Sequence, residues 1–432
     1  MGIERTGWGV AALLAAGLAS GQTLSNQSLT GKYFFRHVSL TTDAAGKPTD
    51  TRSLIGAITF DSAGRYSFTA QQTIGNNAAT SQSGSGTYSV DPAGFVALDN
   101  PLRAGAKINA RVGPEALVGS TTETSDNTFD FFAAIPAPTG GASLAGSYWT
   151  ATLEFPAGSV ANIRNAIFNL TAATGGRFND FTVNGHAANL TAGKPATQQV
   201  TGATFTMAAD GTGTASFGTA STANLLSGAR TLYISADGNV ILGGGTAAGS
   251  HDILIGVKAL ANATNATWNT NFWGAGLRVD STGVTDYAGA AAARGLGKLT
   301  WTKREKALGA GNFDFTGINN YTLRSDGSGT AELTQVGLGA GGKAFVGSSV
   351  DANDPGAYEI YFGTQMASLT GTGIFVNPQG VLNGAGFAPA GNPISPGEFI
   401  TIFGTGFTTS AQTARPPYPL TLGGISVLIN GK

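Results

Sequence analysis

The chain of 432 residues contains no cysteine, few charged residues and no long apolar run. Without cysteine, the protein has neither a disulfide framework nor thiol chemistry. Charged residues make up 11% of the chain and the formal net charge is −1, so the electrostatic attraction that nucleic acid or an anionic membrane surface requires is missing. No segment reaches the ~18 apolar residues of a membrane-spanning helix. We therefore predict neither a nucleic-acid partner nor a transmembrane segment.

The first 21 residues have the layout of a secretory signal peptide. Arg5 precedes the short apolar run from Val10 to Ala19, and the small residues Ser20 and Gly21 follow it. A run of this length is too short to cross a bilayer and is typical of the core of an export signal. The sequence thus predicts a protein that is secreted, extracellular or held at the outer cell surface.

Glycine is abundant, at 65 residues, and 41% of the chain is hydrophobic. Apolar residues at this level can form several cores, and much glycine beside few charges favours short strands joined by tight turns. Three turns contain an Asp that precedes a Gly, directly at Asp210 and Asp326 and after two small residues at Asp61. Such turns between alternating runs predict hairpins, so we expect an all-β fold.

A threefold repeat organises the body of the chain. The segments that begin at Leu29, Leu144 and Asn271 open with similar aromatic strands. A period of roughly 115 residues is longer than that of solenoids or propellers, so each unit is predicted to be a domain with its own core. We expect antiparallel β-meander domains, small barrels or sandwiches, over residues 27–136, 142–262 and 268–368. Barrels are favoured because closure removes exposed strand edges.

Two segments interrupt the repetition. Ser159–Leu170 has apolar residues at helical spacing but is also compatible with a pair of strands. Asp286–Arg294 is rich in alanine and is followed by Gly295, which predicts a short helix.

The C-terminal residues contain two further strand signals, Glu398–Phe403 and Ile425–Ile429. The second runs into Asn430-Gly431, a pair that predicts a type I′ hairpin turn and hence a returning strand. The sequence ends at Lys432 without one. We therefore expect a domain that lacks its closing strands and leaves an unpaired edge beside Ile425–Ile429.

Four motifs near this end resemble a known family. They are Gly384-Ala385-Gly386-Phe387-Ala388-Pro389, Ser395-Pro396-Gly397-Glu398, Ile402-Phe403-Gly404-Thr405-Gly406-Phe407 and Leu422-Gly423-Gly424-Ile425-Ser426-Val427. They resemble the C-terminal Ig-like, TIG-type domain of uncharacterised secreted Acidobacteria proteins of the Solibacter type. The resemblance implies a partial Ig-like β-sandwich over residues 381–432 and a secreted β protein. It implies no activity.

No motif for catalysis or for a cofactor is present. The histidines, His37, His186 and His251, fall in separate repeats without a second ligand at zinc spacing. The loop with Asp351, Asn353 and Asp354 offers oxygen atoms to calcium but lacks the full calcium-loop pattern. We therefore predict no catalytic residue, no cofactor and no metal ion, with this loop as the one weak calcium candidate.

Four aromatic residues are the candidates for ligand binding. Tyr33, Trp149 and Trp273 recur in the opening strands of the three units, and Trp301 lies within a basic cluster. Recurrence in the opening strand of each unit is typical of a core role, while exposed rings form sugar-stacking platforms. Both interpretations stay open at this point.

Three functions are compatible with these features. The first is a secreted or cell-surface structural or interaction protein without catalytic activity. The second is an extracellular module that binds a glycan or a small ligand, with glycans or other surface proteins as partners. The third, a carbohydrate-active enzyme, requires two carboxylates ~5 to 9.5 Å apart in one cleft.

Overall fold

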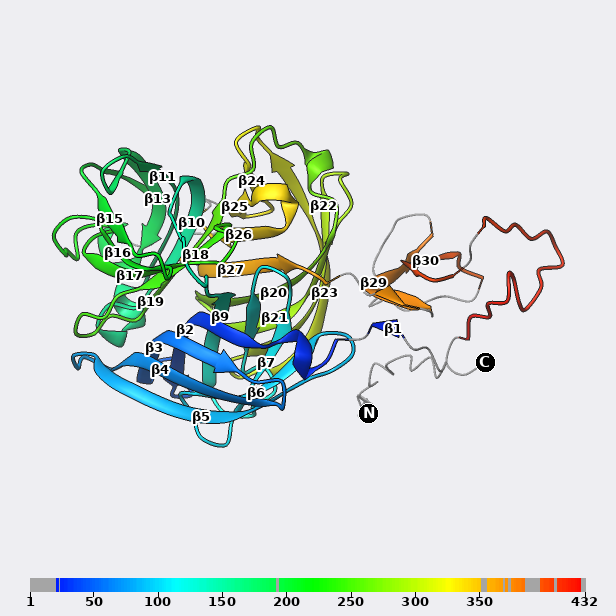
Figure 1. Ribbon diagram of the computed structural model, residues 1–432, viewed down its shortest axis with the longest axis horizontal. Coiled ribbons are helices and arrows are strands. Elements are labelled where there is room, and N and C mark those ends of the chain that lie inside the picture. The colour runs from blue at the N-terminus through cyan, green and yellow to red at the C-terminus, as the bar shows by residue number, and fades with distance from the viewer. Residues whose placement is uncertain are drawn as a thin grey trace, which may run out of the picture.

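The computed structural model describes residues 21–22, 24–191, 194–350, 356–367, 370–371, 374–384, 397–407 and 410–428. The predicted signal peptide, apart from Gly21, and the calcium candidates Asp351, Asn353 and Asp354 lie outside these residues. The described chain is almost entirely β-structure, and its larger sheets form three antiparallel barrels in tandem (Figure 1). The predicted all-β fold of tandem meander domains is confirmed, with barrels in place of sandwiches.

The first barrel is a closed circuit of eight strands joined by hairpins. Its strands are β2 (Gly31–Thr42), β3 (Pro48–Phe60), β4 (Arg65–Ile74), β5 (Thr80–Val90), β6 (Phe95–Asp99), β7 (Lys107–Val112), β8 (Leu117–Ser120) and β9 (Thr128–Pro136). The turn between β3 and β4 shows why the chain reverses where the sequence predicts. The Asp61 carboxylate accepts hydrogen bonds from the backbone N–H groups of Ala63 (2.9 Å) and Arg65 (2.8 Å), and Gly64 supplies the positive φ of 87°.

The second barrel contains an extra hairpin. Its strands are β10 (Gly146–Glu154), β11 (Arg164–Ala173), β12 (Arg177–Phe178), β13 (Phe181–Ala187), β14 (Ala196–Val200), β15 (Thr204–Met207), β16 (Thr212–Ser216), β17 (Ala229–Ile234), β18 (Val240–Gly244) and β19 (Asp252–Lys258). β10 pairs with both β11 and β19 and so closes the circuit, while β13 and β14 branch from β11 with the short helix α1 (Ala188–Thr191) between them. Ser159–Leu170 forms a single 3-10 turn, Val160–Asn162, followed by the start of β11.

The third barrel is again a closed circuit of eight strands. They are β20 (Asn271–Asp280), β21 (Gly283–Ala293), β22 (Lys298–Ala307), β23 (Gly311–Leu323), β24 (Ser328–Ala331), β25 (Thr334–Leu338), β26 (Ala344–Ser348) and β27 (Tyr358–Gln365). The helix predicted over Asp286–Arg294 is wrong, because all of these residues except Arg294 lie in strand β21. Both faces of β21 are buried, with Ala291 inside the barrel and Ala288 between barrels, so tertiary packing overrides the helix propensity of alanine.

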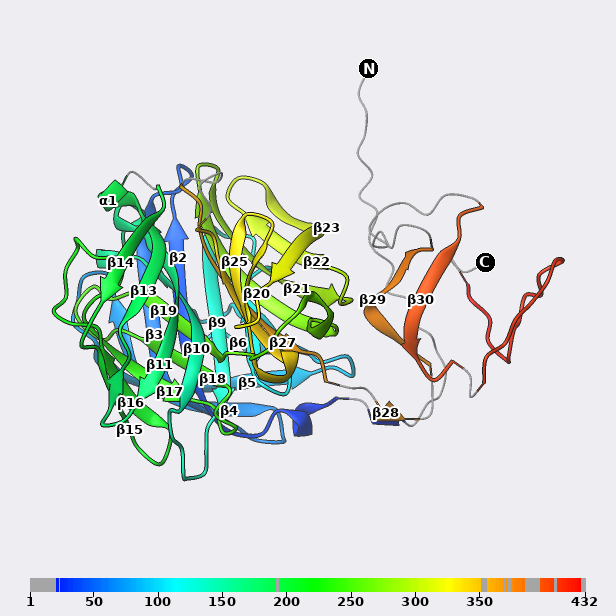
Figure 2. The same cartoon turned by 90° about the horizontal axis from the view of Figure 1, so that it is seen from above.

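A small C-terminal unit lies beside the barrels in Figure 2. Its described strands are β29 (Phe375–Asn383) and β30 (Ile400–Thr405), and β1 (Gly21–Gln22) pairs with β28 (Thr370–Gly371). β30 occupies most of the predicted strand Glu398–Phe403. Of the predicted strand Ile425–Ile429, the described part up to Leu428 forms only an isolated bridge between Leu422 and Ile425. The Ig-like assignment therefore stays a prediction.

Each barrel has its own apolar interior, and a fourth core lies between the barrels. Aromatic side chains such as Phe35, Phe168 and Phe345 occupy the three interiors. The fourth cluster joins outward-facing residues of all three barrels, including Phe131, Ile255 and Ile360. β4, in contrast, alternates buried and exposed residues because its outer face meets solvent. The three barrels thus pack around a shared centre, as the triangle in Figure 1 shows.

The opening strand of each barrel places one apolar residue in the core between the barrels, and the neighbours of this residue on the two adjacent strands match from barrel to barrel. Val38 pairs with Ser53 and Phe131. Leu153 pairs with Asn165 and Ile253 in the same way, and Leu277 with Asp286 and Ile360.

The second-strand residue of each barrel contacts a neighbouring barrel. Ser53 donates to the Ser250 carbonyl (3.3 Å) and Asn165 donates to Ser348 Oγ (2.9 Å). The Asp286 carboxylate accepts from the Asp130 N–H (3.0 Å) and so joins the third barrel back to the first. Head-to-tail contacts of this kind close a ring, and we call its three interfaces the seams.

Candidate functional site

One aromatic residue of each opening strand anchors a seam. Phe34, Trp149 and Trp273 lie four residues before the equivalent positions Val38, Leu153 and Leu277. Phe34 stacks on Tyr233 of the second barrel, with ring centres 4.3 Å apart. The Trp149 indole donates to the Asp326 carbonyl of the third barrel (2.8 Å). The Trp273 ring meets Phe95 of the first barrel at 5.3 Å.

The structure does not bring the four predicted ligand-binding aromatics together. Trp273 is 2% exposed in its seam, and Trp301 is 8% exposed inside the third barrel, beside Phe345. Tyr33 packs edge-on against Phe60 next to the first interior (5.4 Å). Trp149 is half-buried against the third barrel. These positions give the rings packing roles, and none of the four lines the groove described next.

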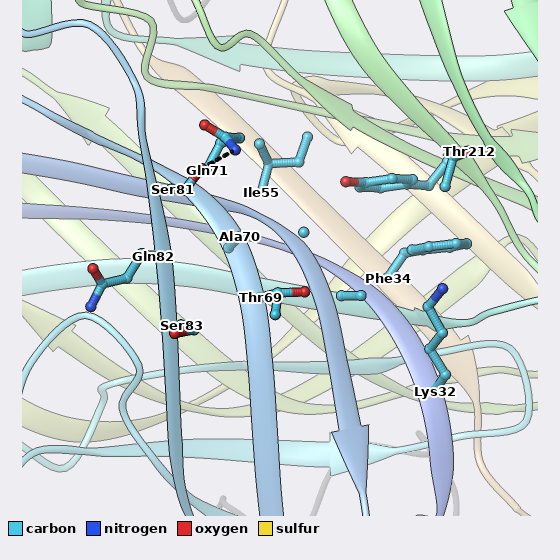
Figure 3. Close-up of a pocket in the computed structure, with 13 residues that line it drawn as sticks. Lys32, Phe34, Ile55, Thr69, Ala70, Gln71, Ser81, Gln82, Ser83 and Thr212 are labelled. Carbon is cyan, nitrogen blue, oxygen red and sulfur yellow. Dashed lines mark hydrogen bonds between the residues drawn. The ribbon is translucent and has the colours of Figure 1, made fainter.

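A groove of about 420 Å³ opens at the seam between the first and second barrels (Figure 3). It is lined by Lys32, Phe34, Ile55, Gly56, Ala57, Thr69, Ala70, Gln71, Ser81, Gln82, Ser83, Thr212 and Tyr233. Thr212 and Tyr233 come from the second barrel, and all the others belong to β2, β3, β4 and β5 of the first. The groove therefore exists only when the two barrels pack together.

The floor of the groove is a regular array set by strand pairing. One row runs across four strands, from Phe34 through Ala57 and Thr69 to Ser83. The neighbouring row runs from Ile55 through Gln71 to Ser81, where the Gln71 amide donates to the Ser81 hydroxyl (3.1 Å). Because adjacent strands lie ~4.8 Å apart, hydroxyl and amide groups repeat at a fixed spacing on the solvent side, and apolar residues lie on the seam side.

The size of the aromatic side chain that anchors each seam explains why the groove opens at the first seam. The first-seam anchor is a phenylalanine, whereas the equivalent residues of the other seams are the larger Trp149 and Trp273. At the second seam Trp149 packs so closely that a Cβ added at Gly337 would lie 2.1 Å from the Trp149 Cβ. The smaller Phe34 and its row neighbour Ala57 leave space above the sheet.

Beneath the groove, buried charges bind the first two barrels to each other. Arg36 Nη2 lies 3.3 Å from Asp252 Oδ1, and Arg36 Nε donates to the Asp252 carbonyl (2.6 Å). Arg230 pairs with the other Asp252 oxygen and lies 3.4 Å from Glu154. Burial opposes the charge on Asp252, but Arg230 and Arg36 together lower its pKa. Burial lowers the pKa of Arg36 to about 10, so the pair is ionised at neutral pH.

A second buried network joins the first and third barrels. His37 Nε2 lies 2.8 Å from Asp130 Oδ2, and Lys306 Nζ lies 4.0 Å from Asp286 Oδ2. Burial raises the pKa of Asp286 to about 8, with Lys306 acting against the shift and Asp130 adding to it. Because all four side chains are buried, this network is structural.

Three turns, one from each barrel, meet at one end of the ring. They contribute Glu115 between β7 and β8, Asp237 between β17 and β18, and Lys343 between β25 and β26. Lys343 Nζ lies 3.9 Å from Glu115 Oε1. Burial, followed by the neighbouring Asp237 carboxylate, raises the pKa of Glu115 to about 7. We call these three residues the turn junction.

The other two histidines are buried in the structure. His251 Nε2 lies 2.8 Å from the Gly75 carbonyl oxygen, and His186 is fully buried. Within the described ranges, no group of three or more His, Asp or Glu side chains is placed to hold a metal ion. Among the same residues, no helix combines the length and apolar character needed to cross a membrane.

Sequence reasoning missed the residues that line the groove. Ser81 and Ser83 recur at every second position of β5, and Thr69 and Gln71 do so on β4. Alternating hydroxyl and amide residues on two successive strands are a signal for a polar outer face. The contribution of Thr212 and Tyr233 has no such signal, because it depends on how the barrels pack.

Comparisons with known proteins give no family. No protein-family model matches the chain, and no curated protein matches it. Among solved structures, the chain is similar to transferrin-binding protein B from Haemophilus parasuis, with 10% identity, coverage of 81% of this chain and 77% of that one, and a TM-score of 0.23. The same protein from Neisseria meningitidis gives 10% identity, coverage of 79% and 77%, and a TM-score of 0.22. Scores this low support no inference about function.

Proposed function

We propose that this chain is a non-catalytic extracellular binding protein that holds a glycan in the groove between its first and second barrels. The observation that carries the proposal is the array of hydroxyl and amide groups from Thr69, Gln71, Ser81 and Ser83 above an apolar wall. Sugars match both parts of this lining. Their hydroxyl groups donate and accept hydrogen bonds, and their C–H faces pack on apolar side chains.

The lining of the groove supports binding without catalysis. The described residues that line it include no carboxylate and no histidine, whereas glycoside hydrolysis uses a pair of carboxylic acids. The aromatic interior clusters of the barrels support placing the ligand at a seam in preference to the inside of a barrel. The export signal read from the sequence supports an extracellular location.

A substitution that copies the other two seams tests the proposal. Phe34→Trp places an indole at the position where Trp149 and Trp273 seal their seams, so it should fill part of the groove. The matched control is Trp149→Phe, which makes the reverse change at the equivalent position of the second seam, away from the groove.

The assay is retention on a polysaccharide array followed by calorimetry on the polymer retained best. We expect Phe34→Trp to weaken binding by at least about tenfold, because lost contacts of ~1.4 kcal/mol correspond to that factor. Trp149→Phe should leave affinity unchanged. If no polysaccharide is retained, or if the bound one is unaffected by Phe34→Trp while the variant stays folded, the proposal is wrong.

A further inference from the structure

Lys32 is a cation at the groove without an ionic partner among the described residues. It lies near the start of β2, and its Nζ is 5.0 Å from the centre of the Phe34 ring. Figure 3 shows its side chain beside Phe34 at the groove. A cation held over an aromatic face in this way is restricted in position. The neighbouring cation on the same strand, Arg36, is committed to Asp252.

The acidic residue Asp210, whose charge interacts with Lys32, is already engaged by hydrogen bonds. Asp210, in the turn between β15 and β16, accepts hydrogen bonds from the Thr212 N–H (3.0 Å) and the Thr212 hydroxyl (2.7 Å). These hydrogen bonds and, to a smaller extent, the charge of Lys32 lower the pKa of Asp210. Asp210 is not part of the groove lining. Among the described residues, the groove lining thus presents one ammonium group and no carboxylate.

We infer that the glycan bound in the groove is acidic, and that Lys32 recognises a carboxylate on one of its sugars. This inference rests on the proposed function. A polymer of uronic acid has hydroxyl groups on one sugar for Thr69 and Ser83, and a carboxylate on a neighbouring sugar for the ammonium group on β2 at the other end of the same row of strands. Charge-assisted hydrogen bonds are about twice as strong as neutral ones, so Lys32 would set the preference among glycans of similar shape.

The test compares polymers that share a backbone and differ in charge. Polygalacturonate and its fully methyl-esterified form have the same sugar chain, but only the first has free carboxylates. We expect calorimetry to give at least about tenfold tighter binding to the acid form, the factor expected when a hydrogen bond to a charged group worth ~1.5 kcal/mol is gained. The difference should shrink as salt concentration rises.

Two variants assign the effect to one residue. Lys32→Met keeps the apolar stem over Phe34 and removes the charge, so it should abolish the difference between acid and ester. Lys47 is an exposed lysine in the turn between β2 and β3, away from the groove lining. The control variant Lys47→Met should therefore preserve the difference between acid and ester. Dextran sulfate beside dextran tests whether a sulfate ester is the preferred anion.

The outcomes separate this inference from the proposed function. Equal binding of acid and ester, or a difference that survives Lys32→Met, would overturn the acidic preference while groove binding stands. Tighter binding of dextran sulfate than of polygalacturonate would overturn the assignment to a carboxylate. If the unmodified protein bound none of the glycans, the proposed function itself would be refuted.

Discussion

Replacing Asp252 with alanine removes the carboxylate that Arg36 and Arg230 share at the seam between the first and second barrels. The side chains of Arg36 and Asp252 are each 1% exposed. After the substitution, Arg36 keeps its hydrogen bond to the backbone carbonyl of residue 252, and the Gly245 N–H loses the acceptor that it has at 2.7 Å. Two buried guanidinium groups, those of Arg36 and Arg230, then remain with Glu154 as the counter-charge, 3.4 Å from Arg230.

The expected loss of stability is about 3–5 kcal/mol, the range found when one partner of a buried ion pair is removed. The assay is urea unfolding followed by tryptophan fluorescence, with the free energy of unfolding compared between variants. Glu123→Ala is the matched control because it also removes an ion pair between barrels, that with Arg304 at 3.1 Å. The two side chains of this control pair are 51% and 32% exposed.

An exposed pair of this kind contributes ~0–1 kcal/mol, so the two substitutions should differ clearly. Equal losses for Asp252→Ala and Glu123→Ala would refute the reasoning, because burial would then have no effect. A second variant separates charge from packing: Arg36→Met combined with Asp252→Leu removes both charges and should recover most of the loss, since apolar replacements of buried pairs are often neutral.

Two further predictions follow from the turn junction and the second seam. The pKa of Glu115 is raised to about 7 in the folded protein, from ~4.3 in the unfolded chain. The folded state therefore holds the proton of Glu115 more tightly than the unfolded state does. This difference adds to the free energy of unfolding in full below pH ~4.3, and the contribution is lost as pH rises through about 7. The Tm should therefore be lower at pH 8 than at pH 5, and Glu115→Gln should reduce the difference; an unchanged slope would contradict this assignment. Gly337→Ala puts a Cβ 2.1 Å from the Trp149 Cβ, so it should destabilise the protein by ~1–3 kcal/mol in urea unfolding, and a loss below ~0.5 kcal/mol would show that the second seam is loosely packed.

The fold was predictable where the deciding interactions are short-range. The turn at Asp61 is fixed by its own carboxylate and by Gly64, and both are visible as a pattern of four residues. Strand β30 followed in the same way from an apolar run between turns. The three-barrel organisation was accessible because the opening aromatics recur along the chain.

Long-range packing decided the features that the sequence did not reveal. The alanines of β21 predicted a helix because burial on two faces of a strand cannot be seen in local spacing. Tyr33, Trp273 and Trp301 are apolar enough for either an exposed platform or a core, and only the seams and interiors place them. The groove joins β2 to β5 with Thr212 and Tyr233, residues more than a hundred positions apart.

The head-to-tail ring has a consequence for valency. Three separate copies of one barrel joined by the same contacts would be identical at every seam, so any groove would occur three times. Joining the barrels in one chain lets the seams differ, and here one holds Phe34 and a groove while the other two hold tryptophan. Under the proposed function, the groove at the first seam gives each chain one point of attachment to a glycan polymer. Tight attachment to a surface would then come from several chains bound along one polymer, where each added contact raises the effective concentration of the next.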